Sequence, residues 1–447
     1  MNPPKPAARA DRVSPWRHLR LFRSDILSAQ PARLYRAWMA EYRTPFFESY
    51  LVNDPSLLRL VLQQRPGDFP KSDRIAEGLR PLLGRSVFLT NGEEWTRQRR
   101  IIDPAFEGGR LRQSFPAMLA AGQAAAARLR AGPVEIEAAA SHAAADVIFR
   151  SLFSIPVEDR LAAAVFASFR DYQRAQPIVN LAAFVPLPRW MPRGHSRRTR
   201  RSAARIRGLI ADLVALRQAR IAEGSAPDDL ATKIMTTPDP ETGRRFDARE
   251  MVDQVAIFFL AGHETSASAL AWALYLLATH PAAQDRAADE ARAFMAAPDF
   301  AGLSRLRFLR DAFREALRLY PPVPMMVRQA ARHECFRRRQ VAKGAQVVLS
   351  PWHLHRHVRL WDDPDAFDPD RYGTANGRAG LRDAYLPFSA GPRVCPGAGF
   401  AMIEGPLLLA CLLAAWRVRP VRGRVPVPVA HLTVRARDGI HLRLEPR

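Results

Sequence analysis

The chain has 447 residues, of which 48% are hydrophobic and 25% are charged, a composition typical of a globular protein and not of a disordered one. Its net charge is +23, and arginine carries nearly all of the positive charge, because the only lysines are Lys5, Lys71, Lys233 and Lys343. Heavy use of arginine and alanine throughout favours a base-composition bias over a nucleic-acid-binding surface. Docking of an acidic electron-transfer protein, or contact with an anionic membrane, are the other interpretations.

Residues 1–20 are expected to form a disordered arm, and residues 21–447 a single domain. The first 16 residues are rich in Pro, Ala and Arg and have no apolar segment, so they match neither a secretory signal nor a membrane anchor. The three cysteines, Cys335, Cys395 and Cys411, lack the paired spacing of a disulfide framework or a zinc site. This usage fits a reducing compartment, and we expect a cytoplasmic protein.

The first informative stretch is residues 91–100, where a helix is expected to begin with Asn91 as its cap. Trp95 and Arg99 are four residues apart and therefore share one helix face. An indole N–H beside a guanidinium would bind a carboxylate well. The alternative is an exposed arginine helix over a packed tryptophan.

Residues 178–201 are apolar and broken by prolines, and they end in a run of arginines. Such a segment would suit a membrane surface or a mobile lid over apolar substrates. A loop followed by a solvated helix face is the interpretation we favour, so membrane contact is expected to be peripheral at most.

The longest predicted helix covers residues 247–280 and stops at Pro281. Its centre contains Ala261, Gly262, Glu264 and Thr265, and the acid favours a buried core helix over a membrane span. A zincin motif is excluded, because it needs a second histidine where Ala267 stands. Thr265 is expected to bond back to the carbonyl of Ala261 and open the helix locally, placing a hydroxyl and an acid beside a groove. A polar kink within the core is the alternative.

Two further helices are expected at residues 286–297 and 303–319. The second places Glu315 and Arg318 three residues apart, which by itself would indicate a surface salt bridge of little energetic value. Arg371 follows in a Phe-Asp-Pro-Asp-Arg-Tyr segment, and Arg328 lies at the start of an extended stretch after a Pro-Pro pair. Short strands are expected in the last thirty residues.

The most specific stretch is residues 388–397, Phe-Ser-Ala-Gly-Pro-Arg-Val-Cys-Pro-Gly. Cys395 lies between a tight turn and an apolar run of helical length, so backbone N–H groups and a helix N-terminus would favour its thiolate. Glycines such as Gly397 would let a flat ligand approach the backbone. A buried structural thiol is the alternative for a lone cysteine.

Residues 388–397 resemble the haem-binding loop of the cytochrome P450 family, F-x-x-G-x-R-x-C-x-G. Three other stretches resemble family motifs in the same order along the chain: the W-x-x-x-R pair, A-G-x-[DE]-T, and E-x-x-R with its later arginine. The resemblance covers residues 40–445. It implies a mainly α fold with a minor β part, built around haem b.

The resemblance also implies a role for each matching residue. Cys395 would be the axial ligand of the iron, with Phe388 close to its sulfur and with Gly397 and Ala261 beside the haem. Glu264 and Thr265 would guide protons to dioxygen, and Glu315, Arg318 and Arg371 would form a buried network that supports the haem loop. The side chains expected to neutralise the haem propionates are Trp95, Arg99, Arg328 and Arg393.

The function implied is hydroxylation of a lipophilic small molecule, such as a fatty acid, terpenoid or polyketide, with dioxygen. Electrons would come from a separate ferredoxin or flavodoxin with its reductase, and the protein is expected to be a monomer without a nucleic-acid partner. Three alternatives are a peroxide-dependent haem-thiolate hydroxylase, a nucleic-acid binder, and a haem sensor or carrier. The intact Glu264–Thr265 pair argues against the first. The sequence does not specify the substrate.

Overall fold

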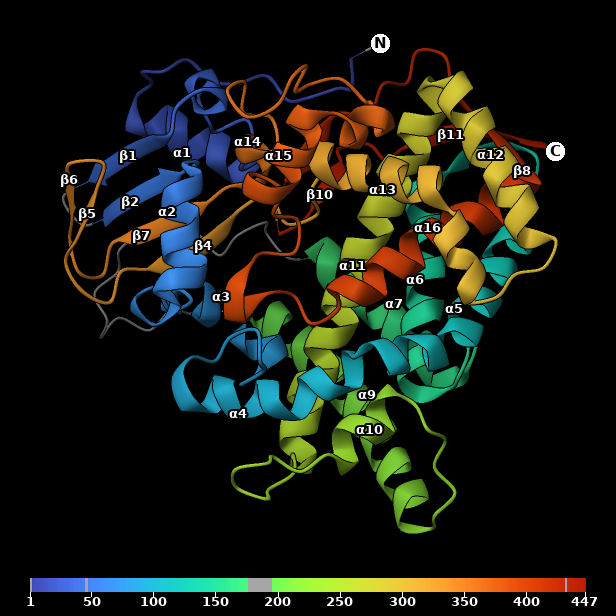
Figure 1. Cartoon of the computed structure of the whole chain (residues 1–447). Helices are drawn as coiled ribbons and strands as arrows, with labels where there is room; N and C mark the ends of the chain where they lie inside the picture. The colour runs from blue at the N-terminus through green and yellow to red at the C-terminus, as the bar shows by residue number, and fades with distance from the viewer. Residues whose placement is uncertain (1, 45–46, 176–194, 431) are drawn as a thin grey trace. The chain divides into compact units, whose positions relative to one another are not determined.

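Helices dominate the computed structural model, which describes residues 2–44, 47–175, 195–430 and 432–447 (Figure 1). The fold class expected from the sequence, mainly α with a minor β part, is confirmed. The helices are α1 Pro15–Ser24, α2 Pro55–Arg59, α3 Asp73–Leu83, α4 Gly92–Ile102, α5 Gly108–Arg128, α6 Ile136–Phe153, α7 Arg160–Ala175, α9 Arg197–Ala222, α10 Leu230–Thr236, α11 Ala248–Thr279, α12 Pro281–Met295, α13 Arg307–Leu319, α14 Pro351–Leu354, α15 Ala375–Asp383 and α16 Ala398–Ala415.

The chain divides into two compact units that alternate along the sequence. The first comprises residues 1–70, 122–141 and 265–447, and the second comprises residues 71–121 and 142–264. Helices α5, α6 and α11 contribute residues to both units. The expectation of a single domain over residues 21–447 therefore stays a prediction.

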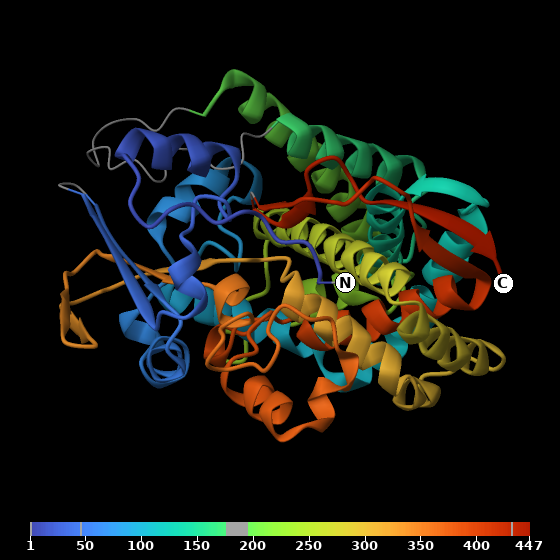
Figure 2. The same ribbon diagram turned by 90° about the horizontal axis from the view of Figure 1, so that it is seen from above.

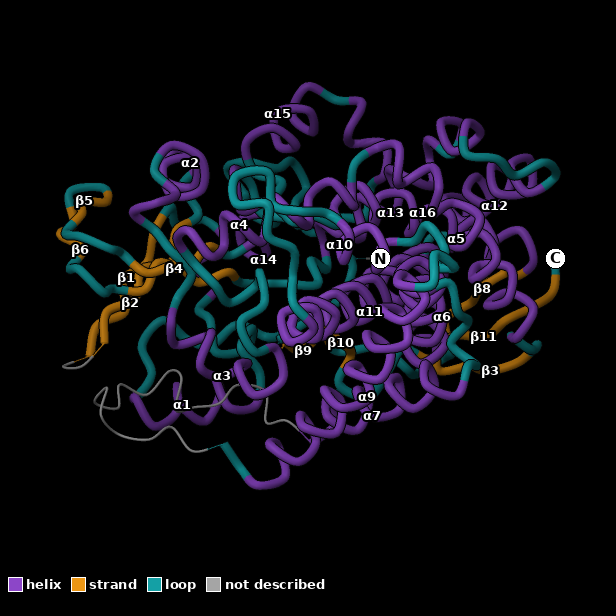
Figure 3. Tube along the Cα trace, turned by 90° about the horizontal axis from the view of Figure 1, so that it is seen from below, coloured by secondary structure: helices purple, strands orange, loops and turns teal. Residues whose placement is uncertain are grey.

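The described strands all belong to the first unit, where they form separate small sheets (Figure 3). The largest sheet has the order β1-β2-β7-β4, and a second has the order β3-β11-β8; β9 pairs with β10, and β5 with β6. The strands are β1 Met39–Thr44, β2 Phe47–Val52, β3 Gly132–Glu135, β4 Met326–Gln329, β5 Glu334–Phe336, β6 Arg339–Val341, β7 Gln346–Leu349, β8 Trp416–Pro420, β9 Pro428–Ala430, β10 Val434–Ala436 and β11 His441–Pro446.

The four-stranded sheet has one apolar face, because every second residue of a strand points to the same side. Tyr50 and Val52 of β2, and Val347 and Leu349 of β7, are buried and pack with the helical segment around Val61. Strand β7 runs parallel to β2 and antiparallel to β4. This sheet therefore fixes the position of β4, the strand that carries Arg328.

Helix α11 begins with a reciprocal cap. The Asp247 carboxylate accepts from the Glu250 N–H at 2.8 Å, and the Glu250 carboxylate accepts from the Asp247 N–H at 3.0 Å. The helix ends at Thr279, just before Pro281 starts α12. Residues 251–260 are all buried, so the prediction of a buried core helix is confirmed. Figure 2 shows α11 along its length.

Among the described residues, one helix is long and apolar enough to cross a membrane: α16, which directly follows the cysteine loop. Of this helix, 61% is buried within the protein, including the run Leu407–Leu413. It packs against α12 and α13, so its apolar composition reflects a place in the core of the first unit.

The N-terminal arm differs from the disorder expected for residues 1–20. Helix α1 starts with Ser14, whose hydroxyl accepts from the Arg17 N–H at 3.2 Å, followed by a proline at the first helical position. Before the helix, the Pro4 carbonyl accepts from the Tyr320 hydroxyl at 2.7 Å, and Arg9 donates to the Ala29 carbonyl at 2.6 Å. These partners are far away in sequence, which is why composition alone did not reveal them.

Candidate active site

Cys395 lies where it was expected, between a short 3-10 turn at Gly391–Arg393 and the start of α16. Its N–H donates to the Phe388 carbonyl at 2.9 Å, and its own carbonyl accepts from the Ala398 N–H at 3.2 Å. Gly391 has φ +67°, and a Cβ there would overlap the carbonyl oxygen of Leu62. The loop therefore needs glycine at this point to keep its path.

The three cysteines have different surroundings. Cys395 is exposed, and a Cβ at Gly397 would stand 3.8 Å from its sulfur, an ordinary contact distance. Cys411 is buried in α16, and burial raises the pKa of its thiol to about 12. Cys335 is exposed on the small β5–β6 pair. Cys395 alone combines exposure with a loop that enters a long helix.

Two arginines of the first unit, Arg328 and Arg393, are at least partly buried, and the charge of Arg393 acts on Arg328. Arg328 is 7% exposed, and burial together with the positive charge of Arg393 lowers its pKa to about 10. Burial also lowers the pKa of Arg393, whose Nη1 donates to the Pro66 carbonyl at 2.7 Å. No carboxylate among the described residues forms an ion pair with Arg328. A bound anion near both guanidinium groups would relieve this cost, so the pair fits the carboxylates of a haem.

Trp95 and Arg99 share a face of α4, as their spacing predicts. The guanidinium carbon of Arg99 lies 5.9 Å from the centre of the Trp95 ring. Arg99 also forms an ion pair with Asp103 at 2.7 Å, a partner that the sequence analysis did not consider. Asn91 precedes the helix, but its side chain bonds to the backbone of Lys71 instead of capping α4.

The centre of α11 has one face that is less buried than the rest. Ala261 is exposed and Thr265 is half-buried, one turn apart, whereas Glu264 is buried at 7% exposure. The helix is continuous through these residues. The bond expected from the Thr265 hydroxyl to the Ala261 carbonyl stays a prediction. Gly262 has a packing role, since a Cβ there would overlap the side chain of Ile148 in α6.

A buried acid that the sequence analysis did not single out lies next to this segment. The Ser266 hydroxyl, one residue after Thr265, donates to Glu404 of α16 at 2.6 Å. Glu404 is 1% exposed, its second carboxylate oxygen has no hydrogen-bond partner, and burial raises its pKa to about 8. A single glutamate in an otherwise apolar helix was the available signal in the sequence.

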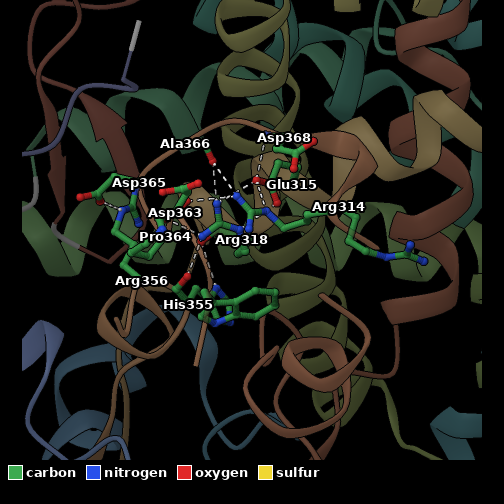
Figure 4. Close-up of polar contacts among 12 residues, drawn as sticks. Arg314, Glu315, Arg318, His355, Arg356, Asp363, Pro364, Asp365, Ala366 and Asp368 are labelled. Atoms are coloured by element: carbon green, nitrogen blue, oxygen red, sulfur yellow. Dashed lines mark hydrogen bonds and ion pairs between the residues drawn. The ribbon is translucent and has the colours of Figure 1, made fainter. Parts of the chain in front are cut away.

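Glu315 is the centre of a buried polar network in the first unit (Figure 4). Its two oxygens accept from Arg318 at 2.8 Å each, from Arg371 at 2.8 Å and from the Tyr372 hydroxyl at 2.8 Å. Arg318 continues to the carbonyls of His355, Pro364 and Ala366 at 2.7–2.9 Å. The association of Glu315, Arg318 and Arg371 is present, and it is buried, as the family resemblance implies and unlike the surface salt bridge that the spacing alone would indicate.

His355 connects this network to the cysteine loop. One ring nitrogen, Nδ1, lies 3.1 Å from the Arg318 carbonyl, and the other accepts from the Leu386 N–H at 2.8 Å. Because a carbonyl only accepts, Nδ1 carries the hydrogen. Burial lowers the pKa of His355 to about 3, which keeps the ring neutral. Leu386 lies two residues before Phe388, so the network holds the entry of the loop.

The predicted site residues are thus described in two sets. The first unit brings Arg328 and Arg393 together and contains Cys395, Phe388, Gly397 and Thr265; the second unit brings Trp95 and Arg99 together and contains Ala261 and Glu264. The apolar segment predicted at 178–201 lies outside the described residues up to position 194.

Comparison with known proteins identifies a matching family model, similar sequences and solved structures with a similar fold. The Cytochrome P450 family model matches residues 34–442. A cyclooctat-9-en-7-ol 5-monooxygenase of Streptomyces melanosporofaciens is 31% identical over 393 residues, covering 86% of this chain and 83% of that protein. Cytochrome P450 4A11 of Homo sapiens is 29% identical over 424 residues, covering 88% and 78%. The crystal structure of the cytochrome P450DA heme domain has a TM-score of 0.82 at 24% identity, covering 100% of this chain and 98% of that one, which confirms the predicted fold.

Proposed function

This chain belongs to the cytochrome P450 family, and on that premise we propose that Cys395 is the cysteine whose thiolate binds the haem iron. Proteins of this family are monooxygenases that use haem with a cysteine thiolate ligand. The observation that carries the proposal is the exposed residue Cys395, in a loop fixed by Gly391 at the start of α16. The buried thiol of Cys411 suits this role poorly.

The haem, when bound, activates dioxygen so that one oxygen atom can be inserted into a C–H bond of the substrate. The chain contributes binding and orientation. Arg328, Arg393, Trp95 and Arg99 would hold the propionates, an assignment supported by the like-charge cost that Arg393 imposes on buried Arg328. Phe388, whose carbonyl accepts from the Cys395 N–H, would pack near the sulfur, and the lack of bulk at Ala261 and Gly397 would allow the haem to approach closely.

Glu264 and Thr265 supply and guide protons in this proposal. The half-buried Thr265 presents a hydroxyl on the less buried face of α11, and Glu264 is the adjacent acid. A positioned acid next to a hydroxyl can pass a proton in steps while excluding bulk water. Product formed per electron pair consumed is the quantity that reports on this role.

The substrate we propose is a lipophilic small molecule such as a terpenoid, a fatty acid or a polyketide. The support comes from the similar proteins, one of which is named as a monooxygenase acting on cyclooctat-9-en-7-ol. Electrons come from a separate ferredoxin or flavodoxin with its reductase, and an acidic partner would suit a chain of net charge +23. We further propose a monomer in the cytoplasm.

The test is the absorbance difference spectrum of the dithionite-reduced holoprotein on adding carbon monoxide. The strongly red-shifted band of thiolate-ligated haem is expected in the unmodified protein and in Cys335→Ser, and it is expected to be lost in Cys395→Ser. Cys335 is the matched control because it is also exposed. A band that survives in Cys395→Ser would remove Cys395 as the ligand. Spin-state shifts with apolar compounds would then identify substrates.

A further inference from the structure

The helix α1 carries an exposed tryptophan among exposed arginines. Trp16 is 81% exposed, more than any other large hydrophobic side chain in the described part of the chain. Arg12 precedes the helix, and Arg17, Arg20 and Arg23 lie within it; all four are exposed. Among the described residues, no carboxylate forms an ion pair with any of these arginines. No acidic residue occurs between positions 12 and 24.

The helix geometry places Trp16, Arg20 and Arg23 on one face, with Arg17 at its edge, about 100° from Trp16. At 100° per residue, Arg20 and Arg23 flank Trp16 within about 40° on either side. The half-buried residues His18, Leu21 and Phe22 are on the opposite side. The exposed face is therefore distinct from the face that packs on the protein.

The helix is held firmly, so its exposed face is a fixed surface. The His18 ring lies 5.1 Å from the ring of Tyr42 in β1, which Figure 1 draws next to α1. At the other end, the buried Asp25 carboxylate accepts from the N–H groups of Leu27, Ser28 and Ala430 at 2.7–3.1 Å. The ring contact of His18 and the hydrogen bonds of Asp25 therefore attach α1 to the rest of the protein at two points.

We propose that this α1 face, made of Trp16, Arg17, Arg20 and Arg23 with Arg12 beside it, docks the protein on an anionic membrane surface. Tryptophan is enriched at the membrane–water interface, and arginines near it attract anionic headgroups. The exposed indole of Trp16 could insert into the membrane–water interface while the arginines contact the headgroups. Docking would bring the enzyme to the membrane, where lipophilic compounds dissolve. Membrane docking is a property beyond the proposed oxidation chemistry.

Helix α9 provides a matched comparison within the same chain. It also presents unusually many exposed arginines, but it contains no aromatic residue. These arginines are Arg197, Arg198, Arg200, Arg201, Arg205 and Arg220. If net charge alone attracted the protein to membranes, removing three charges from α9 would weaken binding as much as removing three from α1.

The experiment is co-sedimentation of the full-length holoprotein with phosphatidylcholine vesicles, with and without phosphatidylglycerol. The variants are Trp16→Ala, the triple change Arg17→Gln, Arg20→Gln and Arg23→Gln, and the control triple change Arg197→Gln, Arg198→Gln and Arg201→Gln. We expect binding only to vesicles containing phosphatidylglycerol, weakened about tenfold or more by the α1 triple change and severalfold by Trp16→Ala. The α9 triple change should have a much smaller effect.

Three results would overturn the proposal. One is the absence of binding to anionic vesicles by the unmodified holoprotein. Another is an equal loss in the two triple variants with no effect of Trp16→Ala, which would assign the binding to net charge. The third is Trp16-dependent retention on DNA together with weak vesicle binding, which would indicate stacking on bases instead. Unchanged haem absorbance in every variant confirms that the protein is still folded.

Discussion

Replacing Glu315 by glutamine tests the polar network that supports the cysteine loop. The change keeps the shape of the side chain and removes its charge. Glu315 and Arg318 are fully buried and Arg371 is 4% exposed, so both guanidinium groups would lose their shared counter-charge inside the protein. Breaking a buried ion pair in this way costs about 3–5 kcal/mol.

This cost converts into a modest shift in melting temperature because the chain is long. Unfolding entropy of about 2.1 cal/mol/K per residue gives roughly 0.9 kcal/mol/K for 447 residues, so Tm should fall by about 3–5 °C. Burial by itself would raise the pKa of Glu315, but Arg318 and Arg371 outweigh it, so the pKa is lowered. The stabilisation from this carboxylate is therefore present at neutral pH and is lost in acid, as the pH falls through that lowered pKa.

The assay is thermal unfolding of the holoprotein, followed by circular dichroism and by haem absorbance. Asp370→Asn is the control, since Asp370 makes the same kind of contact to Arg286 at 2.7 Å with both side chains more than half exposed. An exposed pair contributes about 0–1 kcal/mol, so this variant should shift Tm by about 1 °C or less. Equal shifts for Glu315→Gln and Asp370→Asn would refute the reasoning.

Three other changes test the site. Gly391→Ala should destabilise the protein by about 1–3 kcal/mol and speed haem loss. The reason is that Gly391 has φ +67° and a Cβ there would overlap the Leu62 carbonyl. An unchanged urea midpoint would contradict this prediction. Burial raises the pKa of Glu404 to about 8. The free energy of unfolding should therefore fall by up to about 5 kcal/mol as the pH rises from about 4.5 to 8. In urea titrations, Glu404→Gln should abolish this fall. Thr265→Ala should lower product formed per NADPH while leaving the carbon monoxide band in place. Activity that survives in this variant with peroxide alone would favour the peroxide-dependent alternative.

The sequence predicted best the features that depend on residues close together in the chain. Trp95 and Arg99 share a face because a helix repeats every 3.6 residues, and Cys395 lies at a loop–helix junction because a turn and an apolar run flank it. The helix around Thr265 was expected from its length and apolar composition and is present from Ala248 to Thr279. In each case the signal and the structure lie in the same stretch of chain.

Other features were decided by partners remote in sequence. The spacing of Glu315 and Arg318 alone indicated a surface salt bridge, and the burial implied by the family resemblance depends on the packing of Arg371 and Tyr372 against Glu315. The side chain of Asn91 was expected to cap α4, but it bonds to Lys71.

The sequence by itself determined the family, the fold class and the cysteine loop, because these depend on residue types at fixed short spacings. Only the tertiary structure decided that Arg393 and burial lower the pKa of Arg328, that the Ser266 hydroxyl bonds to Glu404 and that Tyr320 bonds to the N-terminal arm. Burial and electrostatic coupling depend on how distant segments pack, and a local pattern contains no information about those neighbours.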